Sequence, residues 1–303
     1  MSDPVLVTGA TGKQGGAAAR ALLAAGTPVR VLLRDPESEP ARAVLALGAE
    51  PVRGDLDDPA SLTAAVTGVR GVFSVQLPDL TDLMSDGEVV RGRNLVEAAR
   101  AAGVAQFVHT SVSGAGDEVR AVPGWTPDEW SRHYWASKAR VDDLVRTAGF
   151  PHWTVLKPAT FMENLLGRSY MFGDWAERGF VTVFAKDTKL SLVAVRDIGA
   201  TAAAAFADPE RFAGADVELA GDLLTMTEIA EILSGVLGRT VEAPVLSAEQ
   251  AVARGLPPMM VNTQQGMNVR GQAAHPEHAH AFGLTMTGFA AWARDAFGRT
   301  HPS

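Results

Sequence analysis

Short apolar runs and longer amphipathic stretches alternate through the first half of the chain. Apolar runs of four to eight residues are typical of buried strands in a parallel sheet. The stretches between them end at or just before Gly, which is typical of helices. We expect strands at 4–10, 28–35, 49–56, 69–76, 106–113 and 152–159, and helices at 14–26, 39–48, 58–68, 85–103 and 131–148.

This alternation predicts an α/β fold, a Rossmann-type doubly wound parallel sheet with helices on both faces. We expect residues 1–157 to form this NADP-binding Rossmann domain. A smaller, mostly helical C-terminal substrate lobe is expected from 158–189 and 209–303. The strand and helix at 190–208 are expected to pack back onto the first domain.

Polar signals mark helix starts in both halves of the chain. Asp58 can cap the helix that follows it, and Thr225 with Glu228 three residues later matches a capping box. The capping box predicts a helix over 225–239, and the pattern predicts two more over 247–255 and 285–297.

Composition excludes several classes of function. The chain has 303 residues, no cysteine and a net charge of −8, so thiolate metal sites and cysteine nucleophiles are ruled out. An acidic chain does not match a general nucleic-acid or membrane-surface binder. Apolar runs are broken before about 18 residues, and no signal peptide is evident at the start. We expect a cytoplasmic protein with a small-molecule substrate, no nucleic-acid or membrane partner, and a homo-oligomer left open.

A glycine-rich turn, "VTGATGKQGG", follows the first expected strand and opens the first helix. Its glycines are Gly9, Gly12 and Gly15. Glycine permits a tight turn and close approach of the backbone to a pyrophosphate, and the helix N-terminus then faces the phosphates. The turn predicts dinucleotide binding, with Thr11 and Gln14 among the contacts.

The end of the second strand, "LLRDP", bears on the choice between NAD and NADP. Arg34 can hold a 2′-phosphate with a fork of donors, and Lys13 can add a second charge. In the alternative interpretation, Asp35 binds the ribose and Arg34 is a solvated charge. We favour NADP (NADPH) over NAD.

Further cofactor contacts are expected at the ends of later strands. Asp55 and Leu56 follow the third strand and are expected near the adenine. Val75 and Gln76 lie at the end of the fourth strand and are expected near the middle of the cofactor, and Pro158, near the end of the sixth, is a further expected contact.

The stretch "RHYWASKARVDD" places Tyr134 and Lys138 four residues apart on one face of a helix. An ammonium near a phenol favours its ionised form and lowers its pKa. Tyr134 can then donate a proton as hydride arrives, with Lys138 as its charge partner. The fifth strand ends in "HTSVS", whose Ser111 and Ser113 can stabilise an oxyanion. The alternative is a half-buried tyrosine beside a solvated lysine.

These motifs resemble the NmrA-like group of the atypical short-chain dehydrogenase/reductase superfamily. The resemblance runs from residue 5 to about 235, through "VTGATGKQGG", "RVLLRDP", "GDLDDPASL", "FVHTSV", "SKARVDDLVRTAG", "TVLKPATFMENLL" and "VRDIGATAAAAFADPERFAGADVELAGDLLTMTEIAEIL". It implies an NADP-binding Rossmann domain with a small substrate lobe. It also implies that Lys138 contacts the nicotinamide ribose and that Phe161 lies near the nicotinamide.

The resembling group contains both reductases of small electrophiles and redox-sensing regulators. Many members lack the catalytic tyrosine and carry His four residues before the lysine, whereas this chain has Tyr134 there and His133 one residue earlier. This favours an NAD(P)H-dependent reductase of a small carbonyl, quinone or conjugated electrophile. A non-catalytic NADP-binding sensor is the alternative, and an epimerase or dehydratase comes third.

Three other stretches carry weaker signals. "HPEHAH" (275–280) offers metal-ligand types, but we expect a solvated loop and no metal site. Trp125, Trp130 and Trp135 either line an aromatic substrate pocket or pack under an irregular loop. "ARVDDLVR" (139–146) is interpreted as a charged helix face with no further role.

Overall fold

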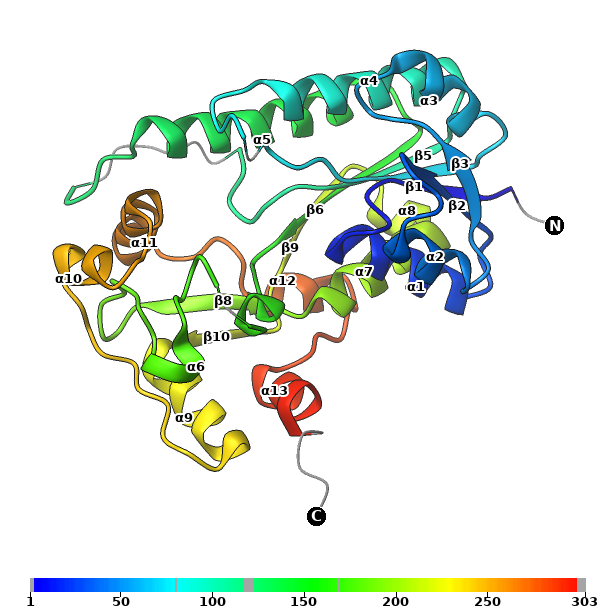
Figure 1. Ribbon diagram of the computed structural model, residues 1–303. Helices are drawn as coiled ribbons and strands as arrows, with labels where there is room; N and C mark the ends of the chain where they lie inside the picture. Colours follow the sequence, from blue (N-terminus) through cyan, green and yellow to red (C-terminus); the bar gives the residue numbers. More distant parts are fainter. Residues whose placement is uncertain (1–2, 80, 117–122, 168, 299–303) are drawn as a thin grey trace. The chain divides into compact units, whose positions relative to one another are not determined.

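The computed structural model describes residues 3–79, 81–116, 123–167 and 169–298. These residues divide into two compact units. Figure 1 shows the chain coloured from its N-terminus to its C-terminus. The first unit is drawn from the residues up to 116, from 134–158 and from 195–217. The second is drawn from 123–133, from 159–194 and from residue 218 onward.

The first unit is built on one large sheet. Within the described residues this sheet has seven strands in the order β3-β2-β1-β4-β5-β6-β9, and β3 to β6 pair in parallel. The strands are β1 Val5–Val7, β2 Val29–Leu33, β3 Glu50–Arg53, β4 Gly71–Ser74, β5 Gln106–Thr110, β6 His152–Pro158 and β9 Ala215–Leu219. The order reverses between β1 and β4, and ligands bind such sheets at the carboxyl ends beside this point. The predicted Rossmann-type fold is confirmed.

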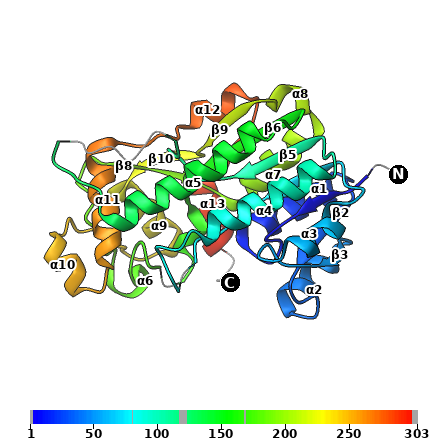
Figure 2. The ribbon, with the colours of Figure 1, turned by 90° about the horizontal axis from the view of Figure 1, so that it is seen from above.

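Helices cover both faces of this sheet (Figures 1 and 2). α3, α4 and α5 lie on one face, while α1 and α7 pack together on the other. The helices of this unit are α1 Lys13–Ala24, α2 Glu39–Leu45, α3 Pro59–Val66, α4 Gly87–Ala101, α5 Glu129–Thr147, α7 Val195–Ala207 and α8 Pro209–Phe212, α5 beginning in the second unit. The predicted helices of the first half are confirmed, with ends shifted by a few residues. Asp58 caps α3 as expected, its carboxylate accepting a hydrogen bond from the Ala60 amide at 3.1 Å.

The core of the first unit lies between its sheet and α3, α4 and α5. Leu6, Leu62 and Leu95 are fully buried there. Phe107 of β5 stacks on Phe150, with ring centroids 4.6 Å apart. This apolar layer fixes α4 and α5 against the strands whose carboxyl ends carry the candidate site.

The second unit contains a small sheet, in the order β10-β8-β7, surrounded by short helices. β8 pairs antiparallel with β10 and parallel with β7. The elements are β7 Thr160–Phe161, η1 Met162–Leu165, α6 Trp175–Arg178, β8 Lys189–Val193, β10 Asp222–Thr225, α9 Met226–Leu237, α10 Ala248–Ala253, α11 Pro258–Arg270, α12 Pro276–Ala281 and α13 Phe289–Phe297.

The segment 190–208 differs from its expectation, because it is shared between the units. Its helix, α7, packs on α1 in the first unit, but its strand, β8, belongs to the small sheet of the second. Leu190 and Leu192 explain this division, since both are buried in the second core.

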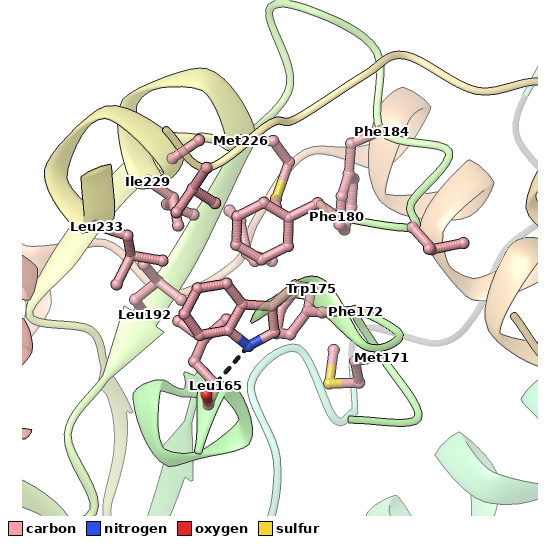
Figure 3. Close-up of a cluster of buried hydrophobic side chains, with 14 of the residues drawn as sticks. Leu165, Met171, Phe172, Trp175, Phe180, Phe184, Leu192, Met226, Ile229 and Leu233 are labelled. Carbon is pink, nitrogen blue, oxygen red and sulfur yellow. Dashed lines mark hydrogen bonds between the residues drawn. The ribbon is translucent and has the colours of Figure 1, made fainter. Parts of the chain in front are cut away.

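The second unit has an apolar core of its own (Figure 3). Trp175 stacks on Phe180 at 5.4 Å, and its indole N–H donates a hydrogen bond to the Leu165 carbonyl at 3.1 Å. Ile229 and Leu233 of α9 close the core from one side. The capping box of α9 at Thr225 is present as predicted. None of the helices in the described part of the chain has both the length and the apolar character to cross a bilayer.

Candidate functional site

The glycine-rich turn joins β1 to α1. Gly9 has a φ of +61°, and the Gly12 amide donates a hydrogen bond to the Gly9 carbonyl at 2.8 Å. A Cβ atom at Gly15 would lie 2.3 Å from that same carbonyl oxygen, so glycine is required. α1 has no acidic residue in its first turn, which begins at Lys13. Free amides and the positive end of the helix dipole therefore fit the pyrophosphate of a dinucleotide.

Arg34 and Asp35, the two residues that follow β2, are both exposed but differ in their contacts. One carboxylate oxygen of Asp35 accepts a hydrogen bond from the Glu37 amide at 3.0 Å, so this side chain closes the local turn. Within the described residues, no hydrogen bond or ion pair holds the Arg34 guanidinium. Arg34 and Lys13 are thus the exposed cations beside the turn.

The predicted contacts after β3 are arranged by local hydrogen bonds. The Asp55 carboxylate accepts a hydrogen bond from the Asp57 amide at 3.0 Å, and the Leu56 carbonyl accepts one from Asn94 at 2.8 Å. These bonds hold the loop after β3 against α4.

The predicted contacts after β4 are buried against the glycine turn. The Val75 amide donates to the Thr8 hydroxyl at 2.9 Å, and the Val75 side chain fills the space where a Cβ of Gly9 would lie. Gln76 donates to the Ser74 hydroxyl at 2.9 Å. Val75 and Gln76 are thus in the first unit with the turn, as the sequence indicates.

Three further predicted cofactor contacts, two in the turn and one at the end of β6, differ in their surroundings. Thr11 is exposed. Gln14 accepts a hydrogen bond from the Thr110 hydroxyl at 2.6 Å, which links the start of α1 to the end of β5. Pro158 ends β6, and its carbonyl accepts a hydrogen bond from the Ser113 amide at 3.0 Å.

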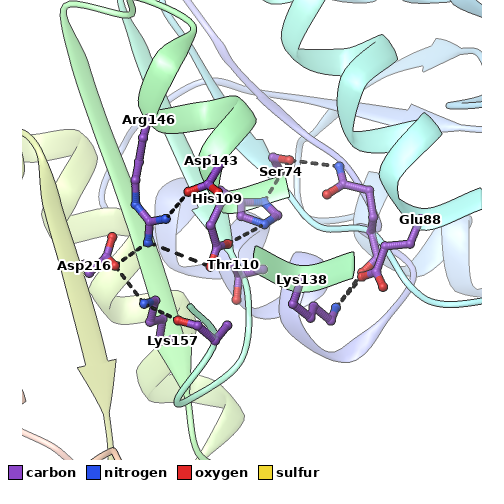
Figure 4. Close-up of polar contacts among 12 residues, drawn as sticks. Ser74, Glu88, His109, Thr110, Lys138, Asp143, Arg146, Lys157 and Asp216 are labelled. Carbon is purple, nitrogen blue, oxygen red and sulfur yellow. Dashed lines mark hydrogen bonds and ion pairs between the residues drawn. The ribbon is translucent and has the colours of Figure 1, made fainter. Parts of the chain in front are cut away.

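Lys138 is buried on α5 and is held by a carboxylate of α4. Its side chain pairs with Glu88, and the two residues are 6% and 3% exposed (Figure 4). The ammonium also lies 3.5 Å from the Gln76 carbonyl oxygen. Lys138 is therefore fixed beside the carboxyl end of β4, at the edge where the sheet order reverses.

Tyr134 lies one turn before Lys138 and is half-buried. The Lys138 ammonium lies 5.7 Å from the centroid of the Tyr134 ring, within cation–π range. Trp135 meets the same ring edge-to-face, with centroids 5.5 Å apart. Because Glu88 balances the ammonium charge, the phenol experiences a charge pair rather than a lone cation.

Ser111 and Ser113 follow β5 on the same edge of the sheet. The Ser111 amide donates to the Leu156 carbonyl at 2.8 Å, and the Ser111 side chain is buried. Ser113 is half-buried. The structure brings Ser111, Ser113, Tyr134 and Lys138 into one unit, and their chemical roles stay predictions.

A second group of charges forms around Asp142, which follows Lys138 by one turn on α5. We call it the Asp142 cluster, and it consists of Asp142 and Arg146 of α5, His109 of β5, Lys157 of β6 and Asp216 of β9. Asp142, which lies on the charged helix face predicted over 139–146, is fully buried. Burial raises the pKa of Asp142 to about 6, although the charges of Lys157 and Arg146 act against the rise.

The other members of the Asp142 cluster surround this carboxylate. His109 Nε2 lies 3.5 Å from the carboxylate, and burial lowers the pKa of His109 to about 3, so the ring is neutral. Lys157 donates to Asp216 at 2.7 Å, and Arg146 also pairs with Asp216 (Figure 4).

The remaining candidates belong to the second unit. Phe161 is half-buried in β7, opposite Val193 of β8, and its contact with the nicotinamide stays a prediction. Trp125 is buried: its N–H donates to the Asn262 carbonyl at 2.8 Å, and Gly266 makes room for its ring. This supports the packing interpretation for Trp125 rather than the aromatic pocket.

The histidine-rich run is not the loop that we expected. Its residues form the short helix α12, and His275 stands at the N-cap position. Pro276 at the first helical position has no amide hydrogen to satisfy, which suits it to start the helix. Within the described ranges, no three His, Cys, Asp or Glu side chains gather as a metal site.

Three charged residues that contribute to this architecture were missed by the sequence analysis. Glu88 lies fifty residues before its partner Lys138, and the available signal was a carboxylate on the inward face of α4. Asp142 and Arg146 follow Lys138 at intervals of four, which indicates a shared face but not its burial.

The chain is similar to proteins that are named reductases and to one named a transcriptional regulator. An NAD(P)H azoreductase of Xenophilus azovorans is 32% identical over 248 residues, covering 82% of this chain and 78% of the relative. The solved triphenylmethane reductase of Citrobacter sp., complexed with NADP(H), superposes with a TM-score of 0.76 at 22% identity, covering 97% and 99% of the two chains.

NmrA, a negative transcriptional regulator solved in complex with NADP, superposes with a TM-score of 0.74 at 18% identity, covering 98% of this chain and 96% of that one. At these identities the two structural matches establish the fold. The model of the NmrA-like family matches residues 1–278, and the resemblance inferred from the motifs is confirmed. The chain belongs to the NmrA-like family.

Proposed function

We propose that the protein is an NADPH-dependent oxidoreductase that reduces a small carbonyl, quinone, azo or conjugated compound. The observation that carries this proposal is the buried Lys138, held beside the carboxyl end of β4 in the same unit as the glycine turn. A phosphate-binding turn suits the pyrophosphate of a dinucleotide, and a fixed ammonium suits the ribose of its nicotinamide half. The azoreductase relative and the triphenylmethane reductase fold support a reductase.

The exposed cations beside the turn favour NADPH over NADH. Arg34 and Lys13 can both reach toward a 2′-phosphate, and a guanidinium fork suits that group. Asp35 is engaged by the Glu37 amide, which makes it a weaker ligand for a ribose hydroxyl. The triphenylmethane reductase solved with NADP(H) supports this choice, whereas NmrA has been solved with both NAD and NADP.

The proposed mechanism divides the chemistry among four side chains. When bound, the cofactor supplies a hydride. Lys138 donates hydrogen bonds to the nicotinamide ribose and orients it, and Tyr134 passes its phenolic proton to the substrate atom that gains charge. Ser111 or Ser113 donates a hydrogen bond to that atom, and solvent returns a proton to Tyr134. The lobe of 158–189 and 209–303 is proposed to enclose the substrate, with Phe161 near the nicotinamide.

The test combines binding with turnover. Purified protein is titrated with NADPH and NADH and then given quinones, azo dyes, enones and aldehydes. We expect NADPH to bind at least tenfold more tightly than NADH, and Arg34→Ala to remove most of that difference. Tyr134→Phe should lower turnover of a carbonyl substrate by about 100-fold with little change in NADPH affinity. Preferential NADH binding would contradict the cofactor assignment.

A dinucleotide-sensing role is the second candidate, favoured by the balanced charge of Lys138 beside Tyr134 and by the NmrA regulator fold. It predicts tight NADPH binding without oxidation by any compound of the panel, unchanged in Tyr134→Phe. That outcome would replace the enzyme proposal with the sensor.

A further inference from the structure

Glu88 is the partner that the buried Lys138 meets on the neighbouring helix. Both side chains are almost completely withdrawn from water, and their charged groups are in direct contact. Taking a lysine ammonium out of water costs several kcal/mol unless a counter-charge repays it. Glu88 therefore allows Lys138 to remain charged in a dry environment before any cofactor arrives.

The close approach of α4 and α5 makes this contact feasible. Glu88 is in the first turn of α4, where the helix dipole favours a carboxylate. One turn later, Gly92 has no side chain, and a Cβ there would lie 2.8 Å from Cγ1 of Val141 on α5. Because Gly92 and Val141 touch, Glu88 and Lys138 are brought into register across the same pair of helices.

The pair also fixes where the ammonium points. A lysine side chain has four rotatable bonds, and ordering it on binding costs affinity. Here Glu88 and the Gln76 carbonyl hold the ammonium from two sides at the end of β4. The conformational entropy of the Lys138 side chain is thus already lost on folding, so cofactor binding does not have to overcome that loss.

We propose that Glu88 is a positioning residue for the cofactor, acting through Lys138. Its negative charge offsets that of the Lys138 ammonium, so the site accepts the oxidised nicotinamide as well as the reduced form. The proposal rests on the proposed dinucleotide site. Oxidised nicotinamide carries a positive ring charge and the reduced form does not. A lone Lys138 ammonium would repel the oxidised ring, whereas the Lys138–Glu88 pair has no net charge and tolerates both forms.

The experiment measures the affinities of Glu88→Gln for NADPH and NADP⁺ on the full chain. We expect NADPH to bind about fivefold more weakly and NADP⁺ about fiftyfold more weakly, so their ratio shifts about tenfold toward NADPH. Glu88→Asp should keep the wild-type ratio while losing some affinity for both. Glu97→Gln on the exposed face of α4 is the matched control, and it should change neither the NADPH affinity nor the NADP⁺ affinity.

A second variant pair tests whether Glu88 acts through Lys138. In a Lys138→Met background, Glu88→Gln should leave the ratio of the two affinities unchanged, because the cation that it compensates is gone. If Glu88→Gln weakens the binding of NADPH and NADP⁺ equally, the charge-balancing role is overturned and Glu88 is only structural. The same conclusion follows if the variant loses thermal stability while the ratio of the two affinities stays at the wild-type value. If wild-type protein binds neither dinucleotide, the proposed cofactor site itself is wrong, which is a different outcome.

Discussion

Helix α5 buries two sets of charged side chains along one face, and the two sets differ in how their charges are compensated. Lys138 makes a one-to-one pair with Glu88 beside the carboxyl end of β4. One turn later, Asp142 is fully buried, yet the His109 ring 3.5 Å away is neutral and the Arg146 guanidinium lies 4.0 Å away. The first set is balanced, whereas Asp142 is buried without a close counter-charge.

This difference teaches that a perturbed pKa is not by itself the mark of the functional site. Desolvation raises the pKa of Asp142 to about 6, but Asp142 lies in a cluster that joins α5 to β5, β6 and β9. Structural ion pairs perturb pKa values as strongly as catalytic ones do. Lys138 differs from this cluster by its position beside the carboxyl end of β4, next to the point where the sheet order reverses. We therefore expect the Asp142 cluster to govern stability and the Lys138–Glu88 pair to govern cofactor binding.

The largest effect on stability is expected from Asp216→Asn. Asp216 is the shared partner of Lys157 and Arg146, and its loss leaves Lys157 buried without a counter-charge. Removing one member of a buried pair costs 3–5 kcal/mol, and because the Asp216 side chain is 33% exposed we expect about 3 kcal/mol. Urea unfolding measures the loss, and NADPH affinity should stay within twofold of wild type.

Asp143→Asn is the control for Asp216. Asp143 also pairs with Arg146, at 2.8 Å, but its side chain is 70% exposed, so its removal should cost less than about 0.5 kcal/mol. A parallel loss of NADPH affinity in Asp216→Asn would break the proposed division between the two regions.

Asp142→Asn is expected to stabilise the protein at neutral pH. The pKa of Asp142 is raised from 3.8 to about 6, so its contribution to stability is complete below pH 4 and is lost as the pH rises through 6. Asparagine keeps the shape but never ionises. We expect the variant to be about 2 kcal/mol more stable than wild type at pH 7.5 and equal to it near pH 4.

The measurement for Asp142→Asn is urea unfolding of both proteins from pH 4 to 7.5. His109 acts in the opposite direction, since its lowered pKa adds stability that is lost as the pH falls below about 6.5. That contribution is present in both proteins and largely cancels in their difference. A difference that does not change with pH would mean that Asp142 is not the titrating group.

The sequence predicted the fold well, because alternation of apolar runs and amphipathic stretches reports local structure directly. It also identified the glycine turn and the caps at Asp58 and Thr225, since each is a short-range pattern. It could not identify Glu88. Helical spacing indicates which residues share a face, but not which helix opposes that face or how closely it approaches.

The second unit was less predictable for a related reason. β7, β8 and β10 are short, and each depends on partners distant in the chain. α11 and α12 lack a clear amphipathic pattern, so the tertiary packing of residues such as Gly266 under Trp125 determines where they lie. The histidine run was interpreted as a loop because its polar composition outweighed the helix-start signal of Pro276.

A smaller effect is expected from Gly92→Ala, which tests whether the spacing of α4 and α5 sets the Lys138–Glu88 contact. The added Cβ would lie 2.8 Å from Val141 and force the helices apart, at a cost of about 1–2 kcal/mol. NADPH affinity should fall severalfold, unlike in the Asp216 variant. Adding Val141→Ala makes room for the new methyl group and should restore most of the affinity, measured in a double-mutant cycle. Additive losses would argue against the spacing as the cause.

The smallest effect is expected from Asp86→Asn, which separates burial from pairing. Asp86 and Arg140 form an ion pair across the same two helices, at 2.7 Å, but their side chains are 56% and 48% exposed. Exposed pairs are screened by water and contribute little, so we expect a loss below about 0.5 kcal/mol in urea unfolding and no change in the NADPH to NADP⁺ affinity ratio. If Asp86→Asn shifted that ratio as strongly as Glu88→Gln, the nearby negative charge alone would be responsible. The buried contact with Lys138 would then not be the feature that distinguishes the site from the surface around it.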